Sequence, residues 1–129
     1  MFVFKVISTK RCRRWAQLLV LGLFVSCKSV PDIVGFDSKA WKSDINGCEG
    51  KRNALAPALE NERKKLRGIA ETDLVHVLGT PNEIQVLERQ QRIYIYWIQH
   101  PNFCKDATLE NKEVRIRLSA VDRVTEVLF

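Results

Sequence analysis

The sequence predicts an α+β domain in which two helices precede a three- to four-stranded antiparallel sheet, an ααβββ-like order with the helices on one face. Three observations lead to this prediction. Apolar residues recur at helical spacing in residues 51–78, and they follow strand spacing in residues 84–129. Gly, Pro and Asp residues mark the turns between these segments.

Two helices are expected in the first half of this domain. The first covers residues 51–67, with its apolar residues on one face and Gly68 after it as a stop. Pro57 lies inside this pattern, and an interior proline removes a helical hydrogen bond, so the ordered helix is expected to begin near Ala56. The second covers residues 71–78, between acidic residues in its first turn and a Gly-Thr-Pro sequence that ends it.

The second half of the domain is expected to contain the strands. Residues 84–89 and 92–99 should pair as a hairpin around Gln90-Gln91, because the second segment is rich in β-branched and aromatic residues. Residues 113–119 alternate strictly between apolar and polar side chains, and residues 124–129 offer a last strand. The resulting sheet should be antiparallel and covered on one face.

The first 27 residues have the pattern of a bacterial lipoprotein export signal. Basic side chains precede an apolar run at residues 16–25, as in secretory signals, and Ser26-Cys27 follows, which resembles a lipobox. The run is about half of the roughly 20 residues that a membrane-spanning helix requires. We therefore expect residues 1–26 to be removed and Cys27 to carry the lipid that anchors the protein. Cleavage without lipidation stays open, because Phe24 stands where lipoboxes usually carry Leu.

Removal of this segment changes the charge of the chain. Five of the 21 Lys and Arg side chains lie before Cys27 and all 15 acidic ones lie after it, which leaves 16 basic side chains against 15. The mature chain would therefore be nearly neutral, although the full chain carries +6. We expect no nucleic-acid binding, because the charge that would favour it is concentrated in the removed segment.

The mature chain is expected to divide into a tether and one domain. Residues 27–46 contain the lipidated cysteine and many polar residues with little periodicity, which is typical of a linker. Phe36 and Trp41 are the exceptions, and they would dock this tether onto the domain. Residues 47–129 would then form one small α+β domain with a single core.

Cys48 and Cys104 are expected to form a disulfide bond. The other two cysteines belong to the export segment, and an exported protein meets an oxidising environment. The bond would close a loop of about 57 residues, for which the chain-entropy model gives roughly 4 kcal/mol. A metal site is the alternative, but only two histidines are available and no CxxC spacing occurs. We expect no metal and no cofactor.

The sequence offers no pattern of residues for catalysis. His76 lies within the second expected helix and His100 precedes Pro101 at a strand end, where local hydrogen bonding or turn chemistry accounts for each. No Gly-rich phosphate loop, HExxH, GxSxG or calcium-loop pattern occurs. We therefore expect no catalytic residues and a protein that is not an enzyme.

One face of the expected sheet is the candidate protein-binding surface. If the odd-numbered residues of the segment 92–99 face the helices, its even-numbered ones share the open face with two arginines. Tyr and Arg on an open face suit protein recognition. The tether covering this face, or aromatic pairs that merely stabilise the sheet, are the alternatives. The candidate residues are Tyr94, Tyr96, Ile98, Arg115 and Arg117.

Several stretches of the domain together resemble a known family. Leu66-Arg67-Gly68-Ile69 precedes a short helix that ends in Val77-Leu78-Gly79-Thr80-Pro81, and strands follow with a Tyr-x-Tyr-Trp core and a closing Val-x-x-Val. Over residues 66–129 the chain resembles the SmpA/OmlA lipoproteins, small parts of the outer-membrane β-barrel assembly machinery with an ααβββ fold. The β-lactamase-inhibitor-like proteins share this fold. The chain looks closest to a lipoprotein group of Bacteroidetes-type bacteria.

The resemblance and the export signal together imply a function. We expect a membrane-anchored envelope lipoprotein that binds or scaffolds proteins, in outer-membrane assembly or maintenance. Lys28 and Ser29 lack the Asp that resembles an inner-membrane retention signal, which favours the outer membrane. The partner would be an envelope protein that the sequence does not identify. The alternative, by analogy with the β-lactamase-inhibitor-like fold, is an inhibitor that docks its sheet face on an envelope enzyme.

Overall fold

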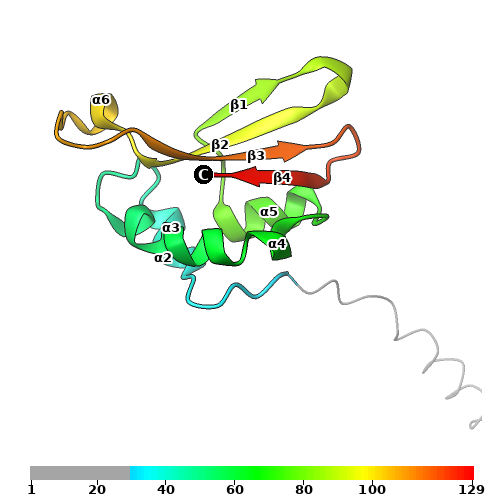
Figure 1. Cartoon of the computed structure of the whole chain (residues 1–129), viewed down its shortest axis with the longest axis horizontal. Coiled ribbons are helices and arrows are strands. Elements are labelled where there is room, and N and C mark those ends of the chain that lie inside the picture. The colour runs from blue at the N-terminus through cyan, green and yellow to red at the C-terminus, as the bar shows by residue number, and fades with distance from the viewer. Residues whose placement is uncertain (1–29) are drawn as a thin grey trace, which may run out of the picture.

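Two layers make up the described part of the chain, one of helices and one of strands (Figure 1). In this computed structural model, which describes residues 30–129, helices precede a four-stranded antiparallel sheet, which confirms the predicted α+β class. The helices are α2 (Ser38–Ser43), α3 (Lys51–Asn61), α4 (Arg63–Leu66), α5 (Glu71–Leu78) and α6 (Pro101–Cys104), with a short 3-10 helix η1 (Glu88–Gln90). The strands are β1 (Glu83–Val86), β2 (Arg92–Gln99), β3 (Lys112–Leu118) and β4 (Val124–Leu128).

The strands follow one another in space in the order β1-β2-β3-β4, and every neighbouring pair is antiparallel. β1 and β2 form the predicted hairpin, but β1 ends at Val86 rather than at residue 89. Arg89 and Gln90 have φ values of 58° and 60°, which belong to a turn and not to a strand. β1 and β4 are the two edges of the sheet, and α6 lies in the connection between β2 and β3.

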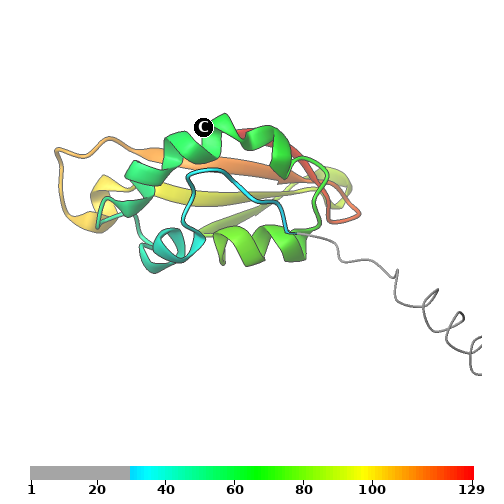
Figure 2. The ribbon, with the colours of Figure 1, turned by 90° about the horizontal axis from the view of Figure 1, so that it is seen from below.

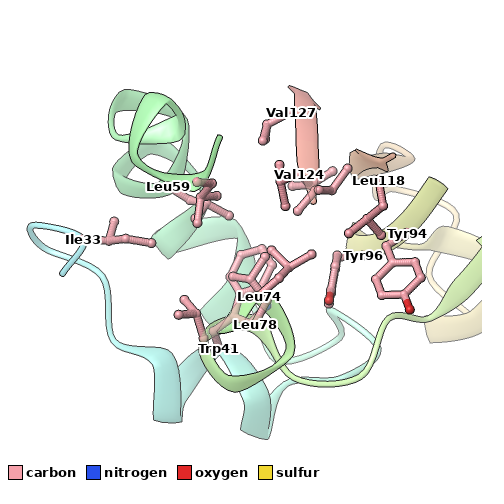
Figure 3. Packing of buried hydrophobic residues seen from close by; sticks show 14 of the residues in the cluster. Ile33, Trp41, Leu59, Leu74, Leu78, Tyr94, Tyr96, Leu118, Val124 and Val127 are labelled. Atoms are coloured by element: carbon pink, nitrogen blue, oxygen red, sulfur yellow. The ribbon is translucent and has the colours of Figure 1, made fainter. Parts of the chain in front are cut away.

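The core lies between the sheet and one layer of helices. Seen from below, α2, α3, α4 and α5 cross in front of the strands (Figure 2). Their apolar side chains meet those of β2, β3 and β4 in one cluster (Figure 3). Its fully buried members are Trp41, Leu59, Leu66, Leu74, Leu78, Tyr96, Val114, Ile116 and Leu118.

The first predicted helix is two helices, and it begins earlier than expected. α3 starts at Lys51 and contains Pro57, and Glu62 separates it from α4. Asp44 explains the early start, because its carboxylate accepts hydrogen bonds from the backbone N–H groups of Glu49 and Arg52 at 3.1 and 3.2 Å. These bonds satisfy N–H groups at the helix start that have no partner within the helix. Pro57 is tolerated on the exposed side of α3.

Much of the predicted tether belongs to the domain. Ile33 is 5% exposed and Trp41 is completely buried, and both are members of the core cluster. Trp41 lies on α2, which begins where Asp37 accepts hydrogen bonds from two backbone N–H groups. The boundary predicted at residue 47 is therefore wrong, since the domain extends at least to Ile33. A linker cannot bury an indole ring in a core, whereas a capped helix packed on α3 and α5 can.

Two predictions fall outside the described residues. The removal of residues 1–26 and the lipid on Cys27 both concern the segment before residue 30. Within residues 30–129, no helix is long and apolar enough to cross a membrane.

Candidate functional site

Tyr94 and Tyr96 lie on the face of β2 opposite to the one predicted for them. Tyr94 and Tyr96 are 4% and 0% exposed and lie directly opposite Ile116 and Val114 on β3. Directly opposed residues of an antiparallel pair project to the same face of the sheet. Tyr94 and Tyr96 therefore face the helices, and so does Ile98, which is 4% exposed and belongs to the core cluster.

A polar partner for each phenol explains this orientation. The Tyr96 hydroxyl donates to the carbonyl of Gly79 at 2.9 Å, and the Tyr94 hydroxyl donates to the carboxylate of Glu71. A buried tyrosine is stable when its ring packs in the core and its hydroxyl finds an acceptor. The placement of Tyr94, Tyr96 and Ile98 on a binding face was therefore wrong.

The opposite face of the sheet, which we call the outer sheet face, carries Ile93, Ile95, Trp97, Arg115 and Arg117. Ile93 lies opposite Arg117, and Ile95 lies opposite Arg115. Ile95 is only 1% exposed although it lies outside the core cluster under the helices. The predicted site residues Arg115 and Arg117 do lie on an open face, but their apolar neighbours are the odd-numbered residues of β2.

Each of the two arginines of the outer sheet face forms an ion pair with a glutamate. Arg115 Nε lies 2.6 Å from Glu113, and Arg117 Nη1 lies 3.7 Å from Glu126. The arginine side chains are 51% and 45% exposed. Exposed pairs of this kind contribute about 0–1 kcal/mol each, so both guanidinium groups can exchange their partners at little cost.

Aromatic side chains gather at one end of the outer sheet face. The ring of Trp97 lies 4.2 Å from that of His100 and 5.4 Å from that of Phe103, measured between centroids. His100 also caps α6, because its Nδ1 accepts a hydrogen bond from the backbone N–H of Phe103 at 3.3 Å. Phe103 is 52% exposed. The aromatic end is therefore held by local structure and still open to a partner.

A second polar group joins the start of α5 to β2 and to the turn before β4. Arg92 binds both carboxylate oxygens of Glu71, at 3.2 and 2.9 Å, and also pairs with Asp122. The hydrogen bond from Tyr94, followed by Arg92, holds the pKa of Glu71 below its ordinary value. Burial, aided by Glu71, raises the pKa of Tyr94 to about 12. We assign this group a structural role, since every charge in it has a partner.

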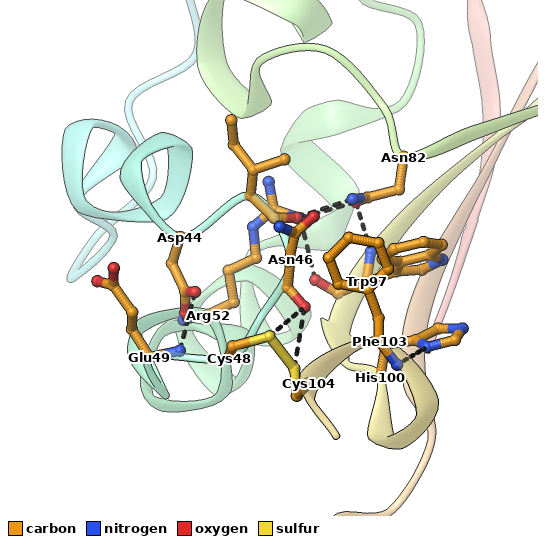
Figure 4. The surroundings of a disulfide bond; sticks show 11 residues. Asp44, Asn46, Cys48, Glu49, Arg52, Asn82, Trp97, His100, Phe103 and Cys104 are labelled. Atoms are coloured by element: carbon orange, nitrogen blue, oxygen red, sulfur yellow. Dashed lines mark hydrogen bonds between the residues drawn. A yellow bond between two sulfur atoms is a disulfide. The ribbon is translucent and has the colours of Figure 1, made fainter. Parts of the chain in front are cut away.

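A pocket of about 620 Å³ lies beside the disulfide bond, since Asn46 and Phe103 are among its lining residues. Figure 4 shows the residues around that bond. Cys48 and Cys104 are bonded as predicted, with their Cα atoms 5.4 Å apart. The bond joins the segment before α3 to α6. Apolar and aromatic side chains form much of the pocket wall, and Arg52 and Asn82 supply polar groups. The remaining lining residues are Lys42, Ile45, Asn46, Leu78, Gly79, Thr80, Pro81, Trp97 and Phe103.

Arg52 is the most deeply buried charged side chain near this pocket, at 1% exposure. Its Nε donates to the carbonyl of Trp41 at 3.1 Å, and its Nη1 donates to Asn82 and to the carbonyl of Trp97 at 2.9 and 3.0 Å. The guanidinium also lies 4.9 Å from the ring centroid of Trp41. Burial lowers the pKa of Arg52 to about 10, and the charge of Asp44 opposes this shift. Arg52 therefore stays charged at neutral pH.

Asn82 connects the elements around this pocket. Its Oδ1 accepts from Arg52 and from the backbone N–H of Trp97, both at 2.9 Å, and its Nδ2 donates to the carbonyl of Ile45 at 2.8 Å. Sequence reasoning missed both Arg52 and Asn82. Arg52 lies in a charged helical segment and Asn82 follows a turn proline, so neither stands out by type or spacing.

The two histidines do not come together in the structure. His76 is exposed on α5, and His100 is the cap of α6. Within residues 30–129 no three His, Cys, Asp or Glu side chains gather in a way that could hold a metal ion. No family model matches the chain, and no similar curated protein or solved structure was found. The outer sheet face and the pocket beside the disulfide are two candidate sites within residues 30–129.

Proposed function

We propose that this protein is a non-enzymatic, lipid-anchored protein of the bacterial cell envelope that binds a partner protein through its outer sheet face. One observation carries the proposal: this face presents Trp97 and Ile93 beside Arg115 and Arg117, while the helices pack on the other side of the sheet (Figure 1). Trp and Arg are among the residue types that contribute most to binding in protein interfaces.

The arrangement of this face supports protein recognition over a purely structural role. Its aromatic end combines Trp97, His100 and Phe103, and its middle carries two half-exposed arginines. Aromatic residues and Arg are enriched in protein interfaces. A partner with an apolar patch flanked by carboxylates would fit it, because those carboxylates can replace Glu113 and Glu126.

The export signal supports the envelope location. Basic residues, a short apolar run and Ser26-Cys27 form the pattern of a lipoprotein signal. We propose the outer membrane as the site of attachment, with a role in outer-membrane assembly or maintenance. The resemblance to the SmpA/OmlA lipoproteins over residues 66–129 supports this part of the proposal.

The binding proposal is tested by affinity capture of the tagged full-length protein from detergent-solubilised membranes. We expect a defined envelope protein to be recovered with the native chain and lost with the Arg115→Glu/Arg117→Glu double variant. Arg63→Glu on the exposed side of α4 is the matched control and should recover the same protein. Equal recovery with all three chains, or no recovery above an untagged control, would count against the proposal.

The anchor is tested separately by membrane fractionation and mass spectrometry of the mature N-terminus. The native chain should sediment with membranes and carry acyl groups on Cys27, whereas Cys27→Ser should carry none. The lipid proposal is abandoned if Cys27 is found unmodified in the native chain.

A further inference from the structure

We infer that the pocket beside the disulfide binds a small carboxylate that bears an apolar group. This inference does not depend on the proposed protein partner. The pocket volume of about 620 Å³ falls within the range of roughly 300–1,000 Å³ that is typical of small-molecule sites. The lining of the pocket combines a charged group with apolar walls. The charged group favours a ligand of opposite charge, and the walls favour a ligand with an apolar group.

The charge comes from a guanidinium that the protein leaves incompletely bonded. Arginine has five N–H donors. The Nε hydrogen and both Nη1 hydrogens of Arg52 have acceptors in Trp41, Asn82 and Trp97, while no acceptor for Nη2 is found among residues 30–129. Nη2 is not among the buried side-chain atoms that lack a hydrogen-bond partner, which means that it reaches solvent. A ligand acceptor can therefore bond to it, and the charge of the guanidinium strengthens such a bond.

No carboxylate of the described chain occupies this position. Arg52 forms no ion pair within 4.0 Å, although Asp44 lies near enough to affect its pKa. Asp44 is directed instead to the backbone N–H groups of Glu49 and Arg52. The charged residues that line the pocket are Arg52 and Lys42, and both are basic. The pocket is therefore complementary to an anion.

A carboxylate with an apolar group fits this lining better than a bare anion. Guanidinium and carboxylate groups match in geometry, and such charge-assisted hydrogen bonds are about twice as strong as neutral ones. Around the guanidinium, Leu78, Pro81 and Ile45 offer apolar contacts, and the ring of Phe103 offers an aromatic one. Figure 4 shows Arg52, Asn82, Trp97 and Phe103 among the residues around the disulfide. A single ring or a short alkyl chain on the acid would use these contacts.

The probe is 3-(4-fluorophenyl)propanoate, followed by ¹⁹F NMR with the full-length chain in detergent and with a detergent-only blank. Its neutral amide, 3-(4-fluorophenyl)propanamide, has the same ring and no charge. We expect the carboxylate to bind at least tenfold more tightly than the amide. Equal affinities, or no binding of either compound above the blank, would overturn the inference.

Variants separate the pocket from other parts of the surface. Arg52→Lys keeps the charge but loses the planar fork, and should weaken binding of the carboxylate at least fivefold. Because Arg52 is buried and this variant risks misfolding, Ile45→Ala serves as a second variant at an exposed wall position outside the outer sheet face and should weaken both compounds. Val121→Ala, 77% exposed and absent from the pocket lining, is the control. If Ile45→Ala binds the carboxylate as well as Val121→Ala does, the pocket is not the site.

Discussion

At the scale of single residues, buried polar groups decide which side chains belong to the core. Tyr94 and Tyr96 are large amphipathic side chains, and each reaches an acceptor supplied by the helix layer, Glu71 and the Gly79 carbonyl. Arg52 is also buried, and carbonyl and amide oxygens accept the hydrogen bonds of its Nε and Nη1 groups. A polar side chain is buried at low cost only where the fold supplies its partners.

Tyr94→Phe is expected to weaken the acid dependence of stability. Loss of the hydroxyl should raise the pKa of Glu71, whose depression is due chiefly to that hydrogen bond. A carboxyl with a depressed folded pKa stabilises the fold above its unfolded pKa of about 4.3, and this contribution is lost as pH falls through the folded pKa. The variant should therefore lose about 1 kcal/mol at pH 7 and much less below the folded pKa of Glu71.

Urea unfolding of the native chain and the variant at neutral and at acid pH measures this difference. Tyr96→Phe is the matched control, because the Tyr96 hydroxyl bonds to a carbonyl that does not titrate. Its loss of stability should be the same at both pH values. If Tyr94→Phe behaves like Tyr96→Phe, Tyr94 does not set the pKa of Glu71.

At the scale of elements, close packing of backbone segments holds the disulfide-linked end of the domain together. Gly47 lies between α2 and α3 with φ of +68°, and a Cβ there would be 2.3 Å from the carbonyl oxygen of Ile98. Gly50, at the start of α3, has a similar φ of +76° but no atom within 4 Å of such a Cβ. The two glycines therefore share the same backbone requirement but differ in the space around them.

Gly47→Ala should destabilise the protein several times more than Gly50→Ala. In Gly50→Ala the cost is the left-handed conformation alone, about 1–2 kcal/mol. In Gly47→Ala the same cost applies, and the backbone must also move away from β2. Chemical denaturation of both variants gives the two free energies of unfolding. Equal losses would show that the approach of Gly47 to β2 is not close in solution.

At the scale of the whole molecule, the segment that contains Trp41 completes the core of the domain, although its composition is typical of a linker. Trp41 of this segment is completely buried beside Arg52, and Ser38 donates to the carbonyl of Val77 on α5. The same end of the domain carries the disulfide bond. Any lipid on Cys27 would therefore be joined to the domain by a short connection, since Ile33 is already in the core.

Trp41→Ala should cost about 3–5 kcal/mol of unfolding free energy, the usual range for loss of a buried large aromatic side chain. Val34→Ala in the same segment should cost little, because Val34 is 68% exposed. Thermal and urea unfolding of both variants test the expectation. A small effect of Trp41→Ala would mean that this segment is a tether after all.

Loss of the disulfide bond, by reduction or in Cys48→Ser/Cys104→Ser, should cost roughly 4 kcal/mol on the chain-entropy model. The sequence separation of 56 residues makes the closed loop long. Urea unfolding of the native and double-variant chains measures the difference. Cys27→Ser, which keeps both bonded cysteines, should unfold as the native domain does. An unchanged midpoint after reduction would refute a stabilising role.

Sequence patterns were sufficient for many local features, for physical reasons that particular residues illustrate. The alternation of Val114, Ile116 and Leu118 predicts a strand with one buried face, and that face is buried. The short helix before Gly79 was predicted with its observed bounds, since acidic residues begin it and Gly-Thr-Pro ends it. In β2, by contrast, seven consecutive residues from Ile93 to Gln99 include apolar or aromatic side chains on both faces. Such a run has no clear alternation, so its inward face is not readable from the pattern.

By itself the sequence determined the α+β class, the pairing of β1 with β2 in a hairpin, and the pairing of Cys48 with Cys104. Only the tertiary structure decided that the tyrosines face the helices, that Trp41 lies in the core, and that Arg52 keeps a solvent-accessible Nη2 beside a pocket. Periodicity and turn residues act between near neighbours along the chain. The orientation of β2 and the burial of Arg52 depend on acceptors at Gly79, Asn82 and Trp97. Those acceptors reach their places only when distant segments pack together.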